Sequence, residues 1–181
     1  MPEELRTGAS NVPSDTPTAR EPLPTIQSYC QSKTFIAHSG INPLIAAGSG
    51  LFSLLNKFSQ INEYKDLESL FENLIHEIKA FECAAHTQGY HSDQILIARY
   101  AICATLDEVI MHSEWGRKSD WKNKNLLYTF QGERWGGESF FLILNRLLND
   151  VKLHIELIEF YYLCISLGFE GKFRHADEGR R

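Results

Sequence analysis

The sequence contains no proline after Pro43, although the stretch from Leu44 to Arg181 makes up most of its 181 residues. Proline removes a backbone donor and breaks helices, so its absence over such a length favours helical structure. Strict alternation of apolar and polar residues, which is typical of half-buried strands, is also scarce here. The sequence therefore predicts helices throughout the part that follows Pro43.

Excess positive charge and long apolar runs are absent as well. The net charge of −5 argues against nucleic acid as the main partner, because phosphate binding needs an electropositive surface. The sequence has no run of eighteen apolar residues and no basic, then apolar, leader, so neither a transmembrane helix nor a secretory signal is predicted within it. With 43% hydrophobic and 23% charged residues, the chain is expected to be soluble and globular.

Familiar catalytic and metal-binding motifs are missing too. The chain has no H-E-x-x-H, no C-x-x-C pair and no G-x-x-x-x-G-K-[ST] phosphate loop. Glu72 with His76, and Glu108 with His112, are four residues apart and share a helix face, but no matching set of ligands accompanies them. We interpret both pairs as surface or half-buried contacts, and we expect no metal and no cofactor.

The first 40 residues differ in composition from the rest. All six prolines lie at or before Pro43, and "GASNVPSDTPTAREPLPT" has almost no large apolar side chains. Such a segment cannot bury enough surface to offset its ordering entropy. We expect a flexible, Pro-rich arm over residues 1–40, a helical domain over 41–175 and a polar tail over 176–181.

The domain is predicted to be all-α, with about six or seven helices. Apolar residues recur at helical spacing within 42–60, 66–89, 92–116, 126–130, 138–150 and 151–171. The third of these is apolar nearly all round until Thr105, which predicts a central, buried helix. Candidate N-caps are Asn42 followed by Pro43, Asp66, and Ser92 or Asp93, and Gly89 can end the second helix in a left-handed conformation.

The stretch "QGERWGGESFF" (131–141) allows three interpretations: a phosphate loop, a catalytic carboxylate site with Glu133 and Glu138, or a corner between helices. Glu138 would repel phosphate, and nothing in the sequence places a cleft around the two carboxylates. Gly136 and Gly137 allow a sharp turn or the close approach of another backbone, and Glu138 suits a first helical turn. We therefore predict a corner, in which one glycine has a conformation that a side chain would strain.

A second corner contains the adjacent carboxylates Asp107 and Glu108. On a helix they point about 100° apart, so we predict that one is satisfied within the fold while the other faces a groove used for protein contact. Trp115, Trp121 and Trp135 also lie at predicted helix corners, where exposed Trp suits a binding surface, and we expect at least one of them to be buried. The candidate protein-binding residues are Asp107, Glu108, Trp115, Trp121, Glu133, Trp135, Gly136, Gly137 and Glu138.

Several segments together resemble the IcmH/DotU family, which includes the TssL proteins of type VI secretion systems. They run in the family's order over roughly 41–175, and the specificity lies in the ordered set. They are Asn42-Pro43-Leu44 with Ala46-Ala47, Leu106-Asp107-Glu108, Trp121, Leu126-Leu127 with Phe130, Gly136-Gly137-Glu138 with Phe140-Phe141, Leu157 through Tyr161, and Leu167-Gly168-Phe169-Glu170-Gly171-Lys172-Phe173-Arg174.

The resemblance implies a non-enzymatic, inner-membrane component of a bacterial type VI or type IVB secretion machine. It implies two small packed helical bundles in a hook shape on the cytoplasmic face, with an IcmF/TssM-type membrane protein as partner. Baseplate proteins and a second copy of the chain are further partners that it leaves open. Family members have a transmembrane helix near the C-terminus, so we expect an anchor after Arg181, and the basic residues Lys172, Arg174, Arg180 and Arg181 suit a cytoplasmic flank.

Two other classes of function remain open from the sequence. The same helices would serve a soluble all-α adaptor unconnected with membranes. A small helical enzyme could instead use Glu133 with Glu138, or Asp107 with Glu108, and a strongly raised carboxylate pKa in a deep pocket would favour it.

Overall fold

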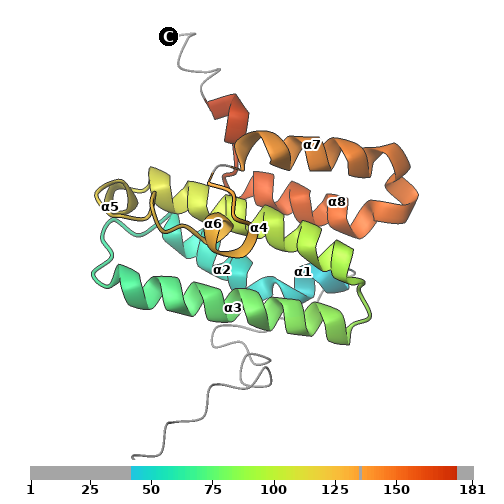
Figure 1. Ribbon diagram of the computed structural model, residues 1–181, viewed down its shortest axis with the longest axis horizontal. Helices are drawn as coiled ribbons and strands as arrows, with labels where there is room; N and C mark the ends of the chain where they lie inside the picture. Colours follow the sequence, from blue (N-terminus) through green and yellow to red (C-terminus); the bar gives the residue numbers. More distant parts are fainter. Residues whose placement is uncertain (1–41, 135, 175–181) are drawn as a thin grey trace, which may run out of the picture.

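A computed structural model describes residues 42–134 and 136–174, and this part of the chain contains helices and no strand (Figure 1). The α-helices are α1 (Pro43–Ala47), α2 (Ser49–Phe58), α3 (Leu67–Thr87), α4 (Ser92–His112), α5 (Glu114–Arg117), α6 (Leu126–Gln131), α7 (Gly137–Leu147) and α8 (Val151–Ser166). Two short 3-10 helices, η2 (Leu148–Asp150) and η3 (Gly171–Phe173), complete the described elements. The all-α prediction is confirmed. The predicted arm (1–40) and tail (176–181) lie outside the described residues.

Helix α4 is the centre of the domain. It contacts α2 and α3 on one side and α7 and α8 on the other, with α5 and α6 against its C-terminal half (Figure 1). These two groups of helices correspond to the expected pair of packed bundles, and α1 joins them by contacting both α3 and α8. Because α4 has neighbours on nearly every side, its residues from Tyr100 to Glu108 are all buried, as its apolar sequence predicted.

The predicted helix starts are mostly confirmed. The Asn42 side chain caps α1 by accepting from the backbone N–H groups of Leu44 (3.0 Å) and Ile45 (3.2 Å), and Asp66 caps α3. The prediction of Ser92 or Asp93 as the cap of α4 is wrong, because Ser92 is already helical and His91 is the N-cap. The His91 backbone N–H is satisfied by the Gln94 side chain at 3.1 Å.

The predicted first helix, over 42–60, is divided at Gly48 into α1 and α2. A Cβ at Gly48 would lie 3.1 Å from the rings of both Phe52 and Phe160, so aromatic side chains pack directly against this backbone. The division and the short α5 explain why the described residues hold eight α-helices rather than six or seven. None of the helices in the described ranges is long and apolar enough to cross a lipid bilayer.

Asn42 also connects the first and last helices of the domain. Its amide nitrogen donates to the Glu156 carbonyl oxygen (2.9 Å) and to Glu159 Oε2 (2.7 Å), both on α8. One buried side chain therefore satisfies an N-terminus and holds that terminus against a helix more than a hundred residues further along.

We predict that Asn42→Ala lowers the free energy of unfolding by about 2–3 kcal/mol, because it removes both a helix cap and the contacts with α8. Asp66→Ala is the matched control, since Asp66 caps α3 by a single bond to the Ser69 N–H (2.9 Å) at an exposed position, and it should cost about 1 kcal/mol. Urea unfolding measures both values. Equal losses in the two variants would show that the contacts with α8 add nothing.

Candidate functional site: the carboxylate pair and the glycine corner

Asp107 organises the connection from α5 to α6. Its Oδ1 accepts from Trp121 Nε1 (2.8 Å) and from the Leu126 backbone N–H (2.9 Å), and its Oδ2 accepts from the Leu127 N–H (2.7 Å). Asn125 accepts from the Tyr128 N–H at 2.7 Å. Together, the two side chains satisfy donors that a helix start leaves without intrahelical partners. Asp107 thus fixes the beginning of α6 from a distance of about twenty residues in sequence.

Burial of Asp107 disfavours the charged form of its carboxyl group, whereas its hydrogen bonds stabilise that form. Burial raises the pKa of the carboxyl to about 6, and the three N–H donors lower the pKa and limit that rise. The group is therefore ionised at neutral pH and loses its charge in mildly acidic solution. Both of its oxygens are occupied by structural donors, which favours a structural role over proton transfer to a substrate.

Glu108 holds the C-terminal segment against α4. It accepts from the backbone N–H groups of Glu170 (3.0 Å) and Gly171 (3.0 Å) and from the Arg174 guanidinium (Nη2, 3.0 Å). The prediction that only one carboxylate of the pair is satisfied within the fold is wrong, because both are. Their separation of about 100° instead directs them to two different segments of the same chain.

The two glycines at the predicted corner have ordinary backbone conformations. Gly136 has φ −100° and ψ −2°, and Gly137 is the first residue of α7, so the expected backbone strain is wrong for both. The close approach of other parts of the chain explains why these two positions hold glycine. A Cβ at Gly136 would lie 2.9 Å from Ala104 Cβ and from Leu127 Cδ2, and one at Gly137 would lie 3.2 Å from the Lys172 backbone nitrogen. The corner is therefore packed tightly on α4 and on the C-terminal segment.

The C-terminal segment is held on its other side by aromatic rings. The Phe140 ring lies 4.0 Å from Phe169 and 4.5 Å from Tyr161, and Phe141 lies 4.8 Å from Phe173 between ring centroids. These contacts and the Glu108 carboxylate fix residues 169–174 between α4 and the start of α7. Of the four basic residues predicted to flank a membrane, Arg174 is thus paired within the domain, and Arg180 and Arg181 lie outside the described residues.

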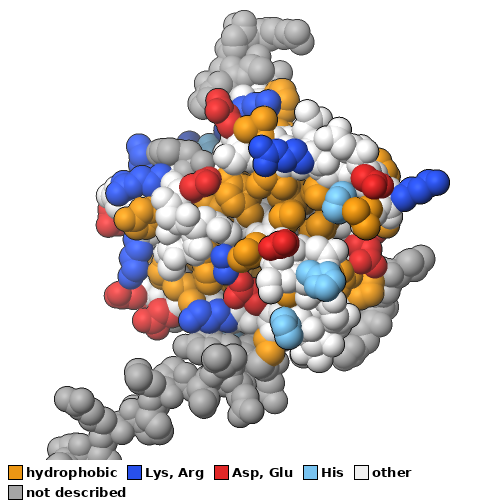
Figure 2. Space-filling model, turned by 45° about the vertical axis from the view of Figure 1, so that its right-hand side comes forward, with side chains coloured by type: hydrophobic (Ala, Val, Ile, Leu, Met, Phe, Trp, Pro, Cys, Tyr) orange, Lys and Arg blue, Asp and Glu red, His pale blue; other side chains and the backbone are white. Residues whose placement is uncertain are grey.

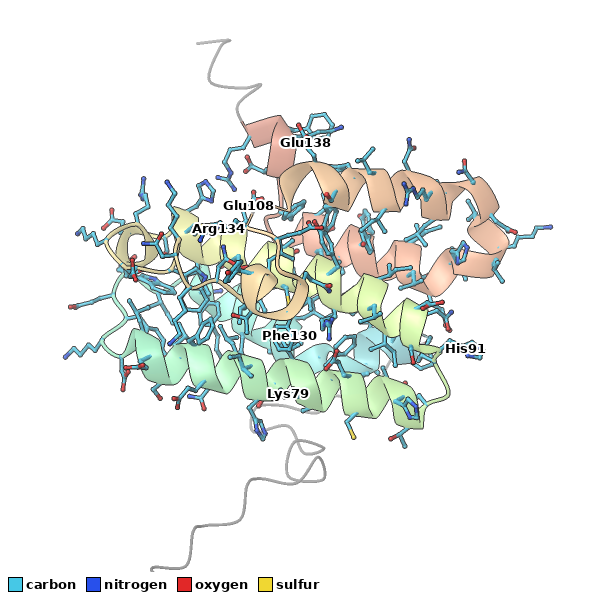
Figure 3. All side chains as sticks on the ribbon, in the orientation of Figure 1. Lys79, His91, Glu108, Phe130, Arg134 and Glu138 are labelled. Carbon is cyan, nitrogen blue, oxygen red and sulfur yellow. The ribbon has the colours of Figure 1, made fainter. Side chains whose placement is uncertain are left out.

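A cavity of about 590 Å³ opens where these parts meet. It brings together five of the predicted site residues, namely Asp107, Glu108, Gly136, Gly137 and Glu138. Arg134, Lys172, Arg174, Met111 and His112 also line this junction pocket, and sequence reasoning did not assign them to a site. Figure 3 shows Glu108, Arg134 and Glu138 at the junction between the end of α4 and the start of α7. The pocket therefore holds basic as well as acidic side chains, and one of the basic residues, Arg174, pairs with Glu108.

Signals for two of the missed residues were present in the sequence. Arg134 lies inside the quoted glycine corner, and its guanidinium lies 5.2 Å from the centre of the Tyr128 ring. His112 is four residues after Glu108, but its Nδ1 contacts the Glu108 carbonyl oxygen (2.7 Å) rather than the carboxylate. Among the residues the structure describes, no group of three or more His, Cys, Asp or Glu side chains is arranged to hold a metal ion.

The other predicted site residues lie elsewhere. Glu133 does not line the junction pocket and accepts from the Tyr100 hydroxyl at 2.9 Å. Trp115 and Trp121 are only 6% and 4% exposed, so the expectation that they present exposed rings at helix corners is wrong, and the expectation that at least one Trp is buried is confirmed. Trp115 packs on Phe58 and Tyr64, and Trp121 packs on Phe71 while bonding Asp107. Trp135 lies outside the described residues.

The fold and the junction pocket define a class of protein, namely an all-α domain whose central helix holds a loop and the C-terminal segment through two carboxylates. Residues 43–181 match the family described as type VI secretion system protein DotU. The chain belongs to this family, and the resemblance to IcmH/DotU proteins is confirmed. It is a TssL-like component of a type VI secretion system.

Solved structures agree with this assignment. TssL from Vibrio cholerae is 39% identical, with a TM-score of 0.68 over 78% of this chain and 88% of that one. The cytoplasmic domain of TssL from Acinetobacter baumannii is 26% identical, with a TM-score of 0.70 over 78% and 90%. SciP/TssL from enteroaggregative Escherichia coli 042, at 21% identity and a TM-score of 0.64 over 74% and 78%, shares the fold. No curated protein has a significant match to the chain.

We predict that the stability difference between the parent and Asp107→Asn depends on pH. The new amide would place an NH₂ group against an N–H donor, so the variant should lose about 1–3 kcal/mol of unfolding free energy at neutral pH. Because the folded pKa of Asp107 is raised, protonation stabilises the parent below its unfolded pKa, and this contribution is lost as pH rises through about 6. The difference in unfolding free energy between the parent and Asp107→Asn, measured by urea unfolding, should therefore widen from pH 7 to pH 4. A difference that narrows on acidification would indicate a lowered pKa.

We predict that Gly136→Ala destabilises the domain by about 1–3 kcal/mol, because the added methyl group overlaps with Ala104 and Leu127. Ala104→Gly, made alone and in the Gly136→Ala background, provides a double-mutant cycle. The loss of unfolding free energy caused by Ala104→Gly, measured by thermal or urea unfolding, should be smaller in the Gly136→Ala background than in the parent. Strict additivity of the two changes would show that the glycine does not serve close packing.

Proposed function

We propose that this chain is the cytoplasmic domain of an inner-membrane protein and acts, without catalysis, as a scaffold of a bacterial type VI secretion machine. We further propose that it binds an IcmF/TssM-type membrane protein and other machine components, including baseplate proteins. The observation that carries the proposal is the match to the DotU family over nearly the whole helical domain. The family description names the type VI secretion system, which favours type VI over type IVB.

The junction pocket is the surface we propose for one of these contacts. It lies where three segments far apart in sequence meet, and its lining carries charges of both signs on the exposed residues Glu138, Arg134 and Lys172. Such a lining can pair with charged side chains of a partner and fix its orientation. Asp107 and Glu108 lie deeper and shape the pocket through the segments that they hold.

The enzyme alternative has less support from the geometry. The raised pKa of Asp107 is the feature that would favour it, but all of its contacts are structural donors. Glu133 and Glu138 do not share the pocket. A second copy of the chain remains a further partner in this proposal.

We predict that Glu138→Lys weakens recovery of partner proteins at least five-fold when the tagged, full-length protein is purified from membranes of its natural host. Glu138 is exposed in the first turn of α7, so reversing its charge should cost no more than about 1 kcal/mol of stability. Glu72→Lys is the matched control, since Glu72 is exposed on α3 and does not line the pocket. Quantitative mass spectrometry of the recovered proteins is the measurement.

Two results would contradict the proposal in different ways. Equal recovery with both variants would show that partners do not use the junction pocket. Failure of the unchanged protein to retain any other component of the secretion machine, or a substrate turnover that Glu133→Ala with Glu138→Ala abolishes, would reject the scaffold role itself.

A further inference from the structure

Exposed apolar side chains are concentrated in the last part of the domain. Among the described residues, eight of the ten large hydrophobic side chains that are exposed lie between Leu142 and Phe173. Figure 2 shows a band of hydrophobic side chains across the middle of one face, at the height of α8. Scattered apolar residues need no explanation, but a group of which five members lie in one helix, α8, marks a contact surface. The eight are Leu142, Leu148, Val151, Leu153, Ile155, Tyr162, Ile165 and Phe173.

Four residues of α8 form a regular line within this surface. Ile155, Ile158, Tyr162 and Ile165 are spaced by three, four and three residues, so they share one helix face. The helix is regular from Ile155 onward, because the only non-helical conformation inside it is at His154. Tyr162 is 71% exposed, Ile155 and Ile165 are exposed, and Ile158 is half-buried. We call this set the α8 stripe.

The domain itself uses the opposite side of α8. Leu157, Phe160, Tyr161 and Cys164 are buried against the core, so the α8 stripe lies outside the face that the domain buries. An amphipathic helix that packs on a core normally keeps its apolar residues on the side that faces the core. Packing within the domain explains only the inner half of this pattern.

The spacing and the charges together define what covers the stripe. A three-four repeat of apolar residues is the pattern by which helices pack side by side in coiled coils. Residues 137–167 contain four acidic side chains (Glu138, Asp150, Glu156 and Glu159) and two basic ones (Arg146 and Lys152), which disfavours an anionic lipid surface. Two copies paired antiparallel about the middle of the stripe would bring their Glu159 side chains together, and like charges repel there.

We propose that the α8 stripe binds an amphipathic helix of another protein, whose apolar residues recur at three-four spacing and are flanked by Lys or Arg. The partner helix would cover the outer face of α8, and its cations would lie near the exposed Glu159. The α8 stripe is separate from the junction pocket, because none of the stripe residues lines that pocket. A result that contradicts helix binding at the stripe would therefore leave the proposed role of the pocket unchanged.

The first experiment places p-benzoylphenylalanine at position 162 of the full-length protein in its natural host and identifies cross-linked segments by mass spectrometry. A matched protein carries the photo-reactive residue at Leu96, which is 43% exposed on α4 and outside the stripe. We expect a cross-link from position 162, absent from position 96, to a segment of another protein with the stated apolar spacing and basic flanks. A cross-link to this chain itself, to lipid, to a segment without that pattern, or to nothing overturns the proposal.

The second experiment measures binding of the cross-linked segment as a synthetic peptide by fluorescence anisotropy. We expect Tyr162→Glu and Ile155→Glu each to weaken the Kd at least ten-fold, while Leu96→Glu leaves it within two-fold. Replacing the flanking Lys and Arg of the peptide by Glu should weaken binding to the parent as well. Circular dichroism melting of all three variants establishes that they are folded, and a Kd unchanged in a folded Tyr162→Glu variant contradicts the proposal.

Discussion

Two adjacent carboxylates at the end of α4 hold the other parts of the site in place. Asp107 accepts backbone N–H groups at the start of α6, and Glu108 accepts those of Glu170 and Gly171. An ionised carboxylate that accepts several N–H donors makes stronger bonds than a neutral acceptor, and in a buried position leaving either side unpaired is costly. A single turn of one helix therefore determines where a loop and the C-terminal segment lie.

The shape of the junction pocket follows from this arrangement. The segment after α6 turns back onto α4 at Gly136, where the absence of a side chain allows contact with Ala104 and Leu127. The C-terminal segment passes close to Gly137, since a Cβ there would lie only 3.2 Å from the Lys172 backbone nitrogen. The pocket is what remains between these packed backbones, so the residues that shape it differ from the exposed residues that a partner can touch. Glu138 belongs to the second group and Asp107 to the first.

The α8 helix adds a different kind of surface to the same domain. Its inner face packs Phe160 against Phe52 and Phe81, and Asn42 fixes it to the first helix. A helix held so firmly on one side can present its other face to a partner with little further loss of conformational entropy on binding. The scaffold role that we propose needs several such rigid surfaces, and the polar pocket and the apolar stripe have chemistries suited to different partners.

The sequence by itself determined the all-α class of this protein and most of its helices. The absence of proline after Pro43, the apolar spacing and the caps at Asn42 and Asp66 depend on local backbone preferences, and local preferences can be read from neighbouring residues. The ordered segments from Asn42 to Arg174 also determined the family. Tertiary structure decided what the singled-out residues do. Trp115 and Trp121 proved to be buried, Gly136 proved to be a packing contact, and Glu108 proved to bind residues more than sixty positions away. Such contacts depend on how helices distant in sequence are placed in space, and no local pattern encodes that placement.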